Sequence, residues 1–126
     1  MRDELTRELL AAGPTIFKTT PTFYFECEDG WFDLLEDLIE LLEAEMAAAE
    51  EPLIVAQVKE KFGGLRFYVY NSNDVCDGYI DWAERRSWKT CCRCGTPGTM
   101  KTNNGWSSVL CEICAAPVAS VVSPKD

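Results

Sequence analysis

Hydrophobic positions along the first ninety residues switch between a helical and an extended period. Leu5, Leu9 and Leu10 share one side of residues 2–12, which predicts a short helix. In residues 23–27, hydrophobic and polar positions alternate, as they do in a short strand. A proline two residues before this segment favours an edge position in a sheet.

The clearest helical pattern covers residues 31–49. Its hydrophobic positions fall on one broad face, formed by Trp31, Leu34, Leu35, Leu38, Ile39, Leu41, Leu42 and Met46. Five acidic positions fall on the opposite face: Asp33, Glu36, Asp37, Glu40 and Glu43. This acidic face is interpreted either as a solvated surface or as a functional one, which is offered to a basic protein or imitates a nucleic-acid backbone.

Residues 53–70 read as two strands joined at Gly63 and Gly64. Both glycines can take positive φ without steric cost, which is typical of a two-residue hairpin turn. That turn predicts a core face that includes Ala56, Val58 and Phe62. On the other face it predicts three opposite pairs: Lys61 with Arg66, Lys59 with Tyr68, and Gln57 with Tyr70.

A second helix is predicted at about residues 79–88, with Ile80, Ala83 and Trp88 turned inward. The preceding stretch, NSNDVCDG, is predicted to be a loop. This helix leads directly to the cysteine-rich part of the chain.

Two cysteine pairs follow, Cys91-x-x-Cys94 and Cys111-x-x-Cys114, separated by sixteen residues. The spacing is that of a four-cysteine zinc site, and Gly95 suits the positive-φ turn after the first pair. Cys92 is interpreted as a spare thiol.

The segment between the pairs has turn signals that predict a short hairpin, so residues 91–116 read as a zinc ribbon. Four thiolates leave no open coordination position, and Zn²⁺ is therefore expected to be structural. The predicted organisation is an acidic body at 1–90, the ribbon at 91–116 and a flexible tail at 117–126. The predicted fold class is α+β, with amphipathic helices on a small antiparallel sheet.

Composition and charge reduce the number of function classes that fit the chain. The 126 residues carry a formal net charge of −9 and contain no histidine. Residues 1–84 hold 6 Lys/Arg and 19 Asp/Glu (6 − 19 = −13), whereas residues 85–126 hold 6 and 2 (6 − 2 = +4). No apolar stretch is long enough to span a membrane and the first residues do not resemble a secretory signal, so a cytoplasmic location is expected. No catalytic constellation is present, and we expect a protein that is not an enzyme.

Within this acidic chain, a basic and aromatic group gathers on one face of the hairpin. The candidate partner-binding residues are Lys59, Lys61, Arg66, Tyr68 and Tyr70. Like charges opposite one another destabilise a strand pair, so these cations need a counter-charge. It is supplied either by the protein's own carboxylates or by an external anion.

The segments KEKFGGLRFY, AERRS and C-x-x-C-G-x-P-G…GW…LC resemble a family of small proteins from phages, prophages and bacteria to which no activity is attached. The resemblance runs from about ECEDGWFDLL to Cys114. It implies a phage-linked setting, hence a host-cell cytoplasm, and a hairpin-plus-ribbon architecture. It implies no catalytic residue.

Three functions follow in order of preference. The first is a zinc-stabilised interaction protein that binds, and by binding inhibits, a host or phage protein complex. The second is a nucleic-acid-binding zinc ribbon, which the net charge and a sequence pI of about 4.5 oppose. An enzyme is the third.

Overall fold

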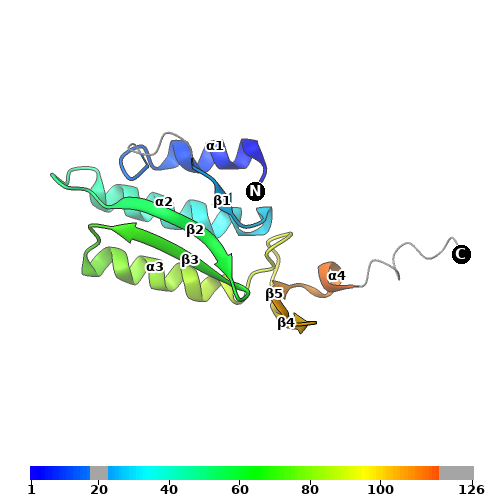
Figure 1. The fold of residues 1–126 in the computed structure, drawn as a ribbon. Coiled ribbons are helices and arrows are strands. Elements are labelled where there is room, and N and C mark those ends of the chain that lie inside the picture. Colours follow the sequence, from blue (N-terminus) through cyan, green and yellow to red (C-terminus); the bar gives the residue numbers. More distant parts are fainter. Residues whose placement is uncertain (18–22, 117–126) are drawn as a thin grey trace, which may run out of the picture.

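Three long helices and a three-stranded sheet form two layers, and a small two-stranded ribbon joins them at one end (Figure 1). The structure is a computed structural model that describes residues 1–17 and 23–116. The tail predicted at 117–126 lies outside the described residues. The elements are α1 (Asp3–Ala12), β1 (Phe25–Glu26), η1 (Asp29–Trp31), α2 (Phe32–Met46), β2 (Ile54–Lys61), β3 (Gly64–Tyr70), α3 (Asp74–Ser87), β4 (Thr99–Asn103), β5 (Trp106–Leu110) and α4 (Glu112–Ala115).

Helix α2 is the centre of the core. It packs between α1 and α3 and, with η1 before it, lies behind the sheet in Figure 1. Trp31 belongs to η1 rather than to the helix, and its side chain is completely buried. The predicted hydrophobic face is buried except at Leu41, which is exposed at the rim: Leu34, Leu35, Leu38, Ile39, Leu42 and Met46 all lie in the core.

Helix α3 begins five residues earlier than predicted. The side chain of Asn73 accepts a hydrogen bond from the Cys76 amide at 2.8 Å, which caps the helix start inside the stretch that was predicted to be a loop. Ile80 and Ala83 are buried as predicted. The prediction that Trp88 points inward is wrong, because this residue follows the last helical residue and is about half exposed.

The sheet has the order β1-β2-β3 and confirms the α+β class. Strands β2 and β3 pair antiparallel, whereas β1 pairs with β2 in parallel, so the larger sheet is mixed. The short β1 strand lies at the edge, as the proline before it predicts.

The hairpin turn is displaced by one residue from the predicted position. Phe62 (φ 54°) and Gly63 (φ 89°) form the turn, and Gly64 is already the first residue of β3, opposite Lys61. Lys59 therefore lies opposite Arg66, and Gln57 lies opposite Tyr68. The pairing moves by two positions along the strand, so Lys59, Arg66 and Tyr68 keep their predicted side of the sheet while their opposite neighbours change.

Two of the predictions of core residues are wrong. Phe62 is 77% exposed because it occupies the turn instead of the strand. Ala56 is exposed at a β-bulge between Val55 and Gln57, where the register shifts. Val58, Leu65 and Phe67 do face the helices and are buried.

Helix α3 also covers the outer edge of β3. The Ser87 hydroxyl accepts a hydrogen bond from the Leu65 amide, and a Glu84 carboxylate oxygen accepts one from the Phe67 amide, each at 3.0 Å. Burial raises the pKa of Glu84, although the bond from Phe67 opposes that shift. Since these side chains occupy the edge amides, α3 blocks the addition of another strand there.

The ribbon is joined to the body through backbone contacts at η1. The Gly30 amide donates to the Cys92 carbonyl at 2.9 Å, and the indole nitrogen of Trp31 donates to the Thr90 carbonyl at 3.0 Å. A Cβ at Gly30 would lie 2.6 Å from that Cys92 oxygen, so the close approach requires glycine. The division of the chain at residue 90 stays a prediction.

Candidate metal centre and interaction face

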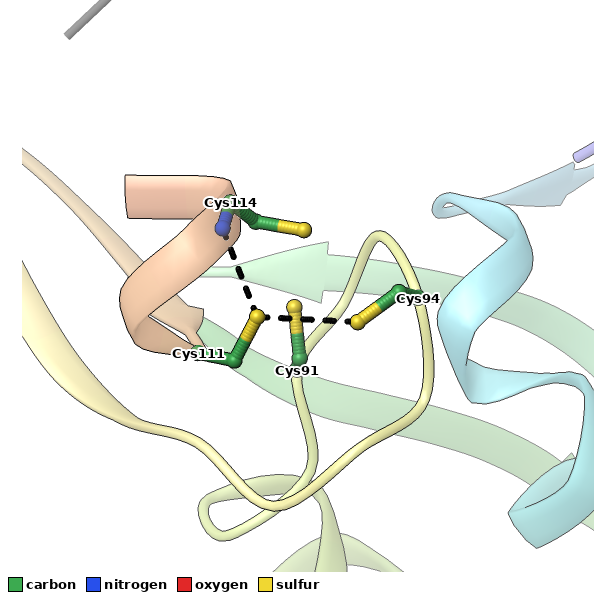
Figure 2. Close-up of side chains that lie close together, drawn as sticks. All are labelled: Cys91, Cys94, Cys111 and Cys114. Carbon is green, nitrogen blue, oxygen red and sulfur yellow. Dashed lines mark hydrogen bonds between the residues drawn. The ribbon is translucent and has the colours of Figure 1, made fainter. Parts of the chain in front are cut away.

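The first cysteine pair lies in a tight loop directly after α3. The Gly95 amide donates to the Cys91 carbonyl at 3.0 Å, and the Cys91 amide donates to the Thr96 carbonyl at 2.7 Å. Gly95 takes φ 83°, as the turn signal predicts. The loop points the sulfurs of Cys91 and Cys94 to the same side (Figure 2).

The second pair lies at the start of α4. Cys111 is the N-cap residue of this short helix, and its Sγ accepts a hydrogen bond from the Cys114 amide at 3.3 Å. One helical turn then brings the Cys114 sulfur to the same point as the others (Figure 2). The ribbon strands β4 and β5 bring the two pairs together across sixteen intervening residues.

The four sulfurs have the spacing of a tetrahedral metal site. All lie within 4.8 Å of one another, and the Sγ atoms of Cys94 and Cys111 are 3.6 Å apart. Thiolates that surround one zinc ion at about 2.3 Å are about 3.8 Å apart in a regular tetrahedron. The donor set and spacing are those of a structural metal-binding module.

Hydrogen bonds prepare this cluster to hold a cation. The Cys114 amide, with help from the Thr96 hydroxyl, lowers the pKa of the Cys111 thiol to about 6. The hydrogen bond to Cys111 raises the pKa of Cys114 to about 12, because a thiol proton is shared between the two sulfurs. Burial opposes ionisation of Cys91, yet amide donors lower its pKa below the usual value. A divalent cation bound here would displace the thiol protons and stabilise all four sulfurs as thiolates.

Of the remaining cysteines, Cys76 and Cys92 are buried, and Cys27 is partly buried against the core. Cys92 belongs to the hydrophobic core at the junction with the body, and its amide donates to the Val109 carbonyl at 2.9 Å. Burial raises the pKa of Cys92 to about 11 and that of Cys27 to about 12. Cys76 is buried in α3. These thiols are poor nucleophiles, and they act as small apolar side chains.

The predicted partner-binding residues lie on the side of the sheet that faces away from the helices. We call this side the open face: Glu26 of β1, Gln57, Lys59 and Lys61 of β2, and Arg66, Tyr68 and Tyr70 of β3, with Tyr24 at its border. Tyr24, Tyr68 and Tyr70 are all exposed and line a shallow groove of about 450 Å³. The Lys59 ammonium lies 6.0 Å from the centre of the Tyr68 ring.

The cations of the open face form no direct ion pair within the described chain, although Arg66 donates to the Leu65 carbonyl at 3.1 Å and lies near enough to Glu84 to oppose the rise that burial causes in the pKa of that carboxyl. Lys59 and Arg66 lie directly opposite one another, and neither they nor Lys61 form an ion pair with any residue that the structure describes. Glu26 lies beside Lys59, and its carboxylate accepts a hydrogen bond from the side-chain amide of Gln57 at 3.3 Å. The ion pairs lie elsewhere: Arg2–Asp29, Arg85–Asp81, Arg86–Asp37, Arg93–Glu28 and Lys101–Glu112.

Sequence reasoning missed two exposed aromatic residues beside this face. The strand pattern assigns Phe62 to the core, and no role of its own is predicted for Trp106, yet the two residues are 77% and 79% exposed. The Asn-Gly signal before Trp106 locates the ribbon turn, so it could have placed that tryptophan at a hairpin tip. Nothing in the local pattern places the tip of one hairpin beside the tip of the other.

Protein-family models, curated proteins and solved structures were compared with the chain, and none matches it. The resemblance carried by KEKFGGLRFY therefore stays a prediction, as do the phage setting and the cytoplasmic location. Among the helices of the described residues, none has the length and apolar character needed to cross a bilayer.

Proposed function

We propose that the four cysteines hold Zn²⁺ and that this ion fixes the fold of the ribbon. The support is the all-sulfur donor set, the tetrahedral spacing and the scarcity of buried apolar side chains in residues 91–116. Zinc has no redox chemistry, and four protein ligands leave no position for a substrate. Native mass spectrometry of protein purified under reducing conditions tests this, with one zinc ion per chain expected and a metal-free, folded ribbon contradicting it.

We further propose that the protein is a non-enzymatic interaction module that binds an acidic protein surface with its open face. The observation that carries this proposal is the absence of ion pairs at Lys59, Lys61 and Arg66 among the described residues, in a chain with 21 acidic side chains. Exposed tyrosines beside basic side chains have the composition of protein-interaction hot spots.

The distribution of charge favours a protein partner over a nucleic acid. A polyanion extends beyond the open face, so it meets the field of the whole chain, whose net charge is −9. A protein partner needs only a local acidic patch, within the Debye length of about 8 Å in which surface charges act at physiological salt. The open face offers side chains rather than a free strand edge, because α3 covers β3, so recognition occurs on the flat of the sheet.

The biological setting proposed here is the one that the resemblance implies. A small phage-type protein that covers an acidic surface of a larger host or phage complex would inhibit that complex by occlusion. The acidic face of α2 belongs to the helical layer, away from the open face, so it does not repel a partner bound there.

Affinity capture with a charge-reversed variant tests the interaction. Tagged wild type and Lys59→Glu/Lys61→Glu are expressed in a bacterial host, captured proteins are identified, and binding is then measured between purified components. We expect the double variant to remain folded and to lose its partner, mainly through a slower association rate.

The matched control carries the same change of charge at positions away from the open face. Arg7→Glu/Lys89→Glu alters two exposed cations that form no ion pair with a described residue. If this control loses the partner as strongly as the open-face variant, net charge rather than the open face determines binding. If purified wild type binds single-stranded DNA or RNA at physiological salt more tightly than any protein, the nucleic-acid alternative replaces this proposal.

A further inference from the structure

Two hairpin turns of the same backbone conformation meet where the ribbon contacts the body. The turn between β2 and β3 has φ angles of 54° at Phe62 and 89° at Gly63, and the turn between β4 and β5 has 53° at Asn104 and 83° at Gly105. Positive φ at both central positions is the turn that fits strand twist best, and Asn-Gly is its preferred sequence. The ribbon follows that preference, whereas the sheet hairpin has phenylalanine in place of asparagine.

Phenylalanine at this position carries a conformational cost that its burial does not offset. A left-handed backbone costs a residue with a Cβ roughly 1–2 kcal/mol, and asparagine relieves part of this through local hydrogen bonds. The Phe62 side chain is 77% exposed, so the hydrophobic effect returns little. A strained, exposed aromatic side chain points to a role outside the folding of the chain.

Phe62 and Trp106 line a common cleft. Its other lining residues are Glu60, Lys61, Gly105 and Ser107, and its volume is about 290 Å³. This is smaller than the pockets of about 300–1,000 Å³ that hold drug-sized ligands, and it suits a single large side chain. The ribbon packs closely against the hairpin turn beside this cleft. A Cβ at Gly63 would lie 2.9 Å from Met100 Cε and 3.2 Å from the Ser107 carbonyl carbon of the ribbon.

The cleft has one cation and one carboxylate in its lining, and it adjoins the basic open face. The Lys61 ammonium lies 5.7 Å from the centre of the Phe62 ring, and the same strand carries Lys59 two residues earlier. The Glu60 carboxylate, which also lines the cleft, accepts a hydrogen bond from the Gly63 amide and keeps its negative charge. An occupant therefore meets two aromatic side chains beside one cation and one carboxylate, whose charges offset each other. The charge that favours acidic residues next to its apolar group is that of Lys59, on the adjoining open face.

We propose that this cleft is an anchor pocket for one aromatic side chain from an acidic segment of the partner protein. The inference rests on the proposed function and adds its specificity: the open face attracts acidic side chains, while Phe62 and Trp106 enclose the anchor. A nucleobase would also fit between two aromatic rings, but its phosphates would meet the unfavourable field of the whole chain.

Titration of the full-length, zinc-loaded protein with synthetic peptides tests the pocket. The probe is a short peptide of glutamate and aspartate with one central phenylalanine, and the comparison peptide has alanine at that position. Binding is followed by the NMR signals of the Trp106 indole and of the Lys59 and Lys61 amides. We expect both peptides to shift the lysine signals, and only the phenylalanine peptide to shift the Trp106 indole and to bind about tenfold more tightly.

Variants then assign the effect to the cleft. Phe62→Asn is expected to abolish the tenfold preference without loss of fold, since asparagine suits the turn, and Trp106→Ala is expected to do the same. Ile113→Ala is the control, because Ile113 is an 86% exposed apolar residue of the ribbon that does not line the cleft.

The outcomes separate the two proposals. Equal binding of both peptides, with shifts at the lysines and none at Trp106, overturns the anchor pocket and leaves the open face intact. Failure of both peptides to bind at millimolar concentration overturns the open face as an acidic-protein surface and the pocket with it. Tighter binding of a thymidine oligonucleotide than of the phenylalanine peptide, with a shift at Trp106, assigns the cleft to bases instead.

Discussion

The described residues of the body, up to residue 90, bury twenty hydrophobic side chains, whereas residues 91–116 bury three, of which two are cysteines. Each large side chain that is fully buried in the body contributes about 1.5–3 kcal/mol relative to exposure. In the ribbon, Trp106 and Ile113 are exposed, and Val109 is the one buried hydrophobic residue that is not a cysteine. Burial accounts for the fold of the body, whereas the ribbon has little burial and depends, in our proposal, on the metal that its four cysteines would hold.

The junction between the regions combines both kinds of interaction. Cys91, a metal-ligand candidate, and Cys92, a core residue, are neighbours on the chain, and the Cys92 carbonyl accepts the Gly30 amide of the body. A metal held by the four cysteines would therefore fix the ribbon at the point where the ribbon meets η1. This arrangement also keeps Trp106 beside Phe62.

Loss of a sulfur ligand has the largest expected effect. Cys111→Ser removes the ligand whose pKa is lowered to about 6 by the Cys114 amide, and structural zinc sites contribute an apparent binding energy of about 10–16 kcal/mol. We expect the variant to lose its metal and its ribbon fold while the body stays folded, as measured by native mass spectrometry and limited proteolysis. Cys76→Ala is the control, because this buried cysteine is outside the cluster and should leave metal content unchanged.

A core truncation in α2 should destabilise the body instead of the ribbon. Leu38 is completely buried, and Leu38→Ala should lower the free energy of unfolding of the body by about 2–5 kcal/mol. Urea denaturation followed by circular dichroism measures this loss. Ile113→Ala, at an exposed position in the ribbon, should change the same quantity by less than about 0.5 kcal/mol. Similar losses from the two variants would contradict the contrast between the regions.

The junction can be broken without touching either core. In Gly30→Ala, the new Cβ meets the carbonyl oxygens of Cys91 and Cys92, and we expect a cost of roughly 1–3 kcal/mol and faster amide exchange at Cys92. Gly78→Ala is the matched control. Nothing lies within 4 Å of a Cβ there, and alanine inside α3 should add about 0.5–1 kcal/mol of stability.

Exchange of residues between the two turns gives the smallest effect. Phe62→Asn should raise the free energy of unfolding by about 1 kcal/mol or less, since it gives the sheet hairpin the Asn-Gly sequence of the ribbon. Thermal denaturation should show a slightly higher melting temperature. The reciprocal Asn104→Phe should weaken the ribbon by a similar amount. A loss of stability in Phe62→Asn would show that Phe62 serves the fold instead of a partner.

Much of the fold is readable from the sequence because its signals are local. The face of α2 from Leu34 to Met46 follows the helical period, and two Cys-x-x-Cys pairs at sixteen residues fit one metal ion. The side of the sheet that carries Lys59, Lys61 and Arg66 also follows from strand alternation. These features depend on spacing alone.

The errors arose where two local signals competed or where the decisive contact was distant. Gly63 and Gly64 both suit a turn, but Gly64 packs beside the Trp88 indole, where a Cβ would collide, so the strand needs this second glycine. The start of α3 was missed because an asparagine cap within NSNDVCDG was read as a loop signal. The cleft depends on the docking of the ribbon on the body, which no spacing along the chain encodes.

Hydrogen–deuterium exchange with and without a zinc chelator, under reducing conditions, tests the contrast between the regions most directly. We predict that chelation removes amide protection from residues 91–116, including the Cys92 amide bonded to Val109, while α2, β2 and β3 keep theirs. Loss of protection throughout the body, or full protection of the ribbon after the metal is removed, would contradict the claim that burial holds one region and a metal centre the other.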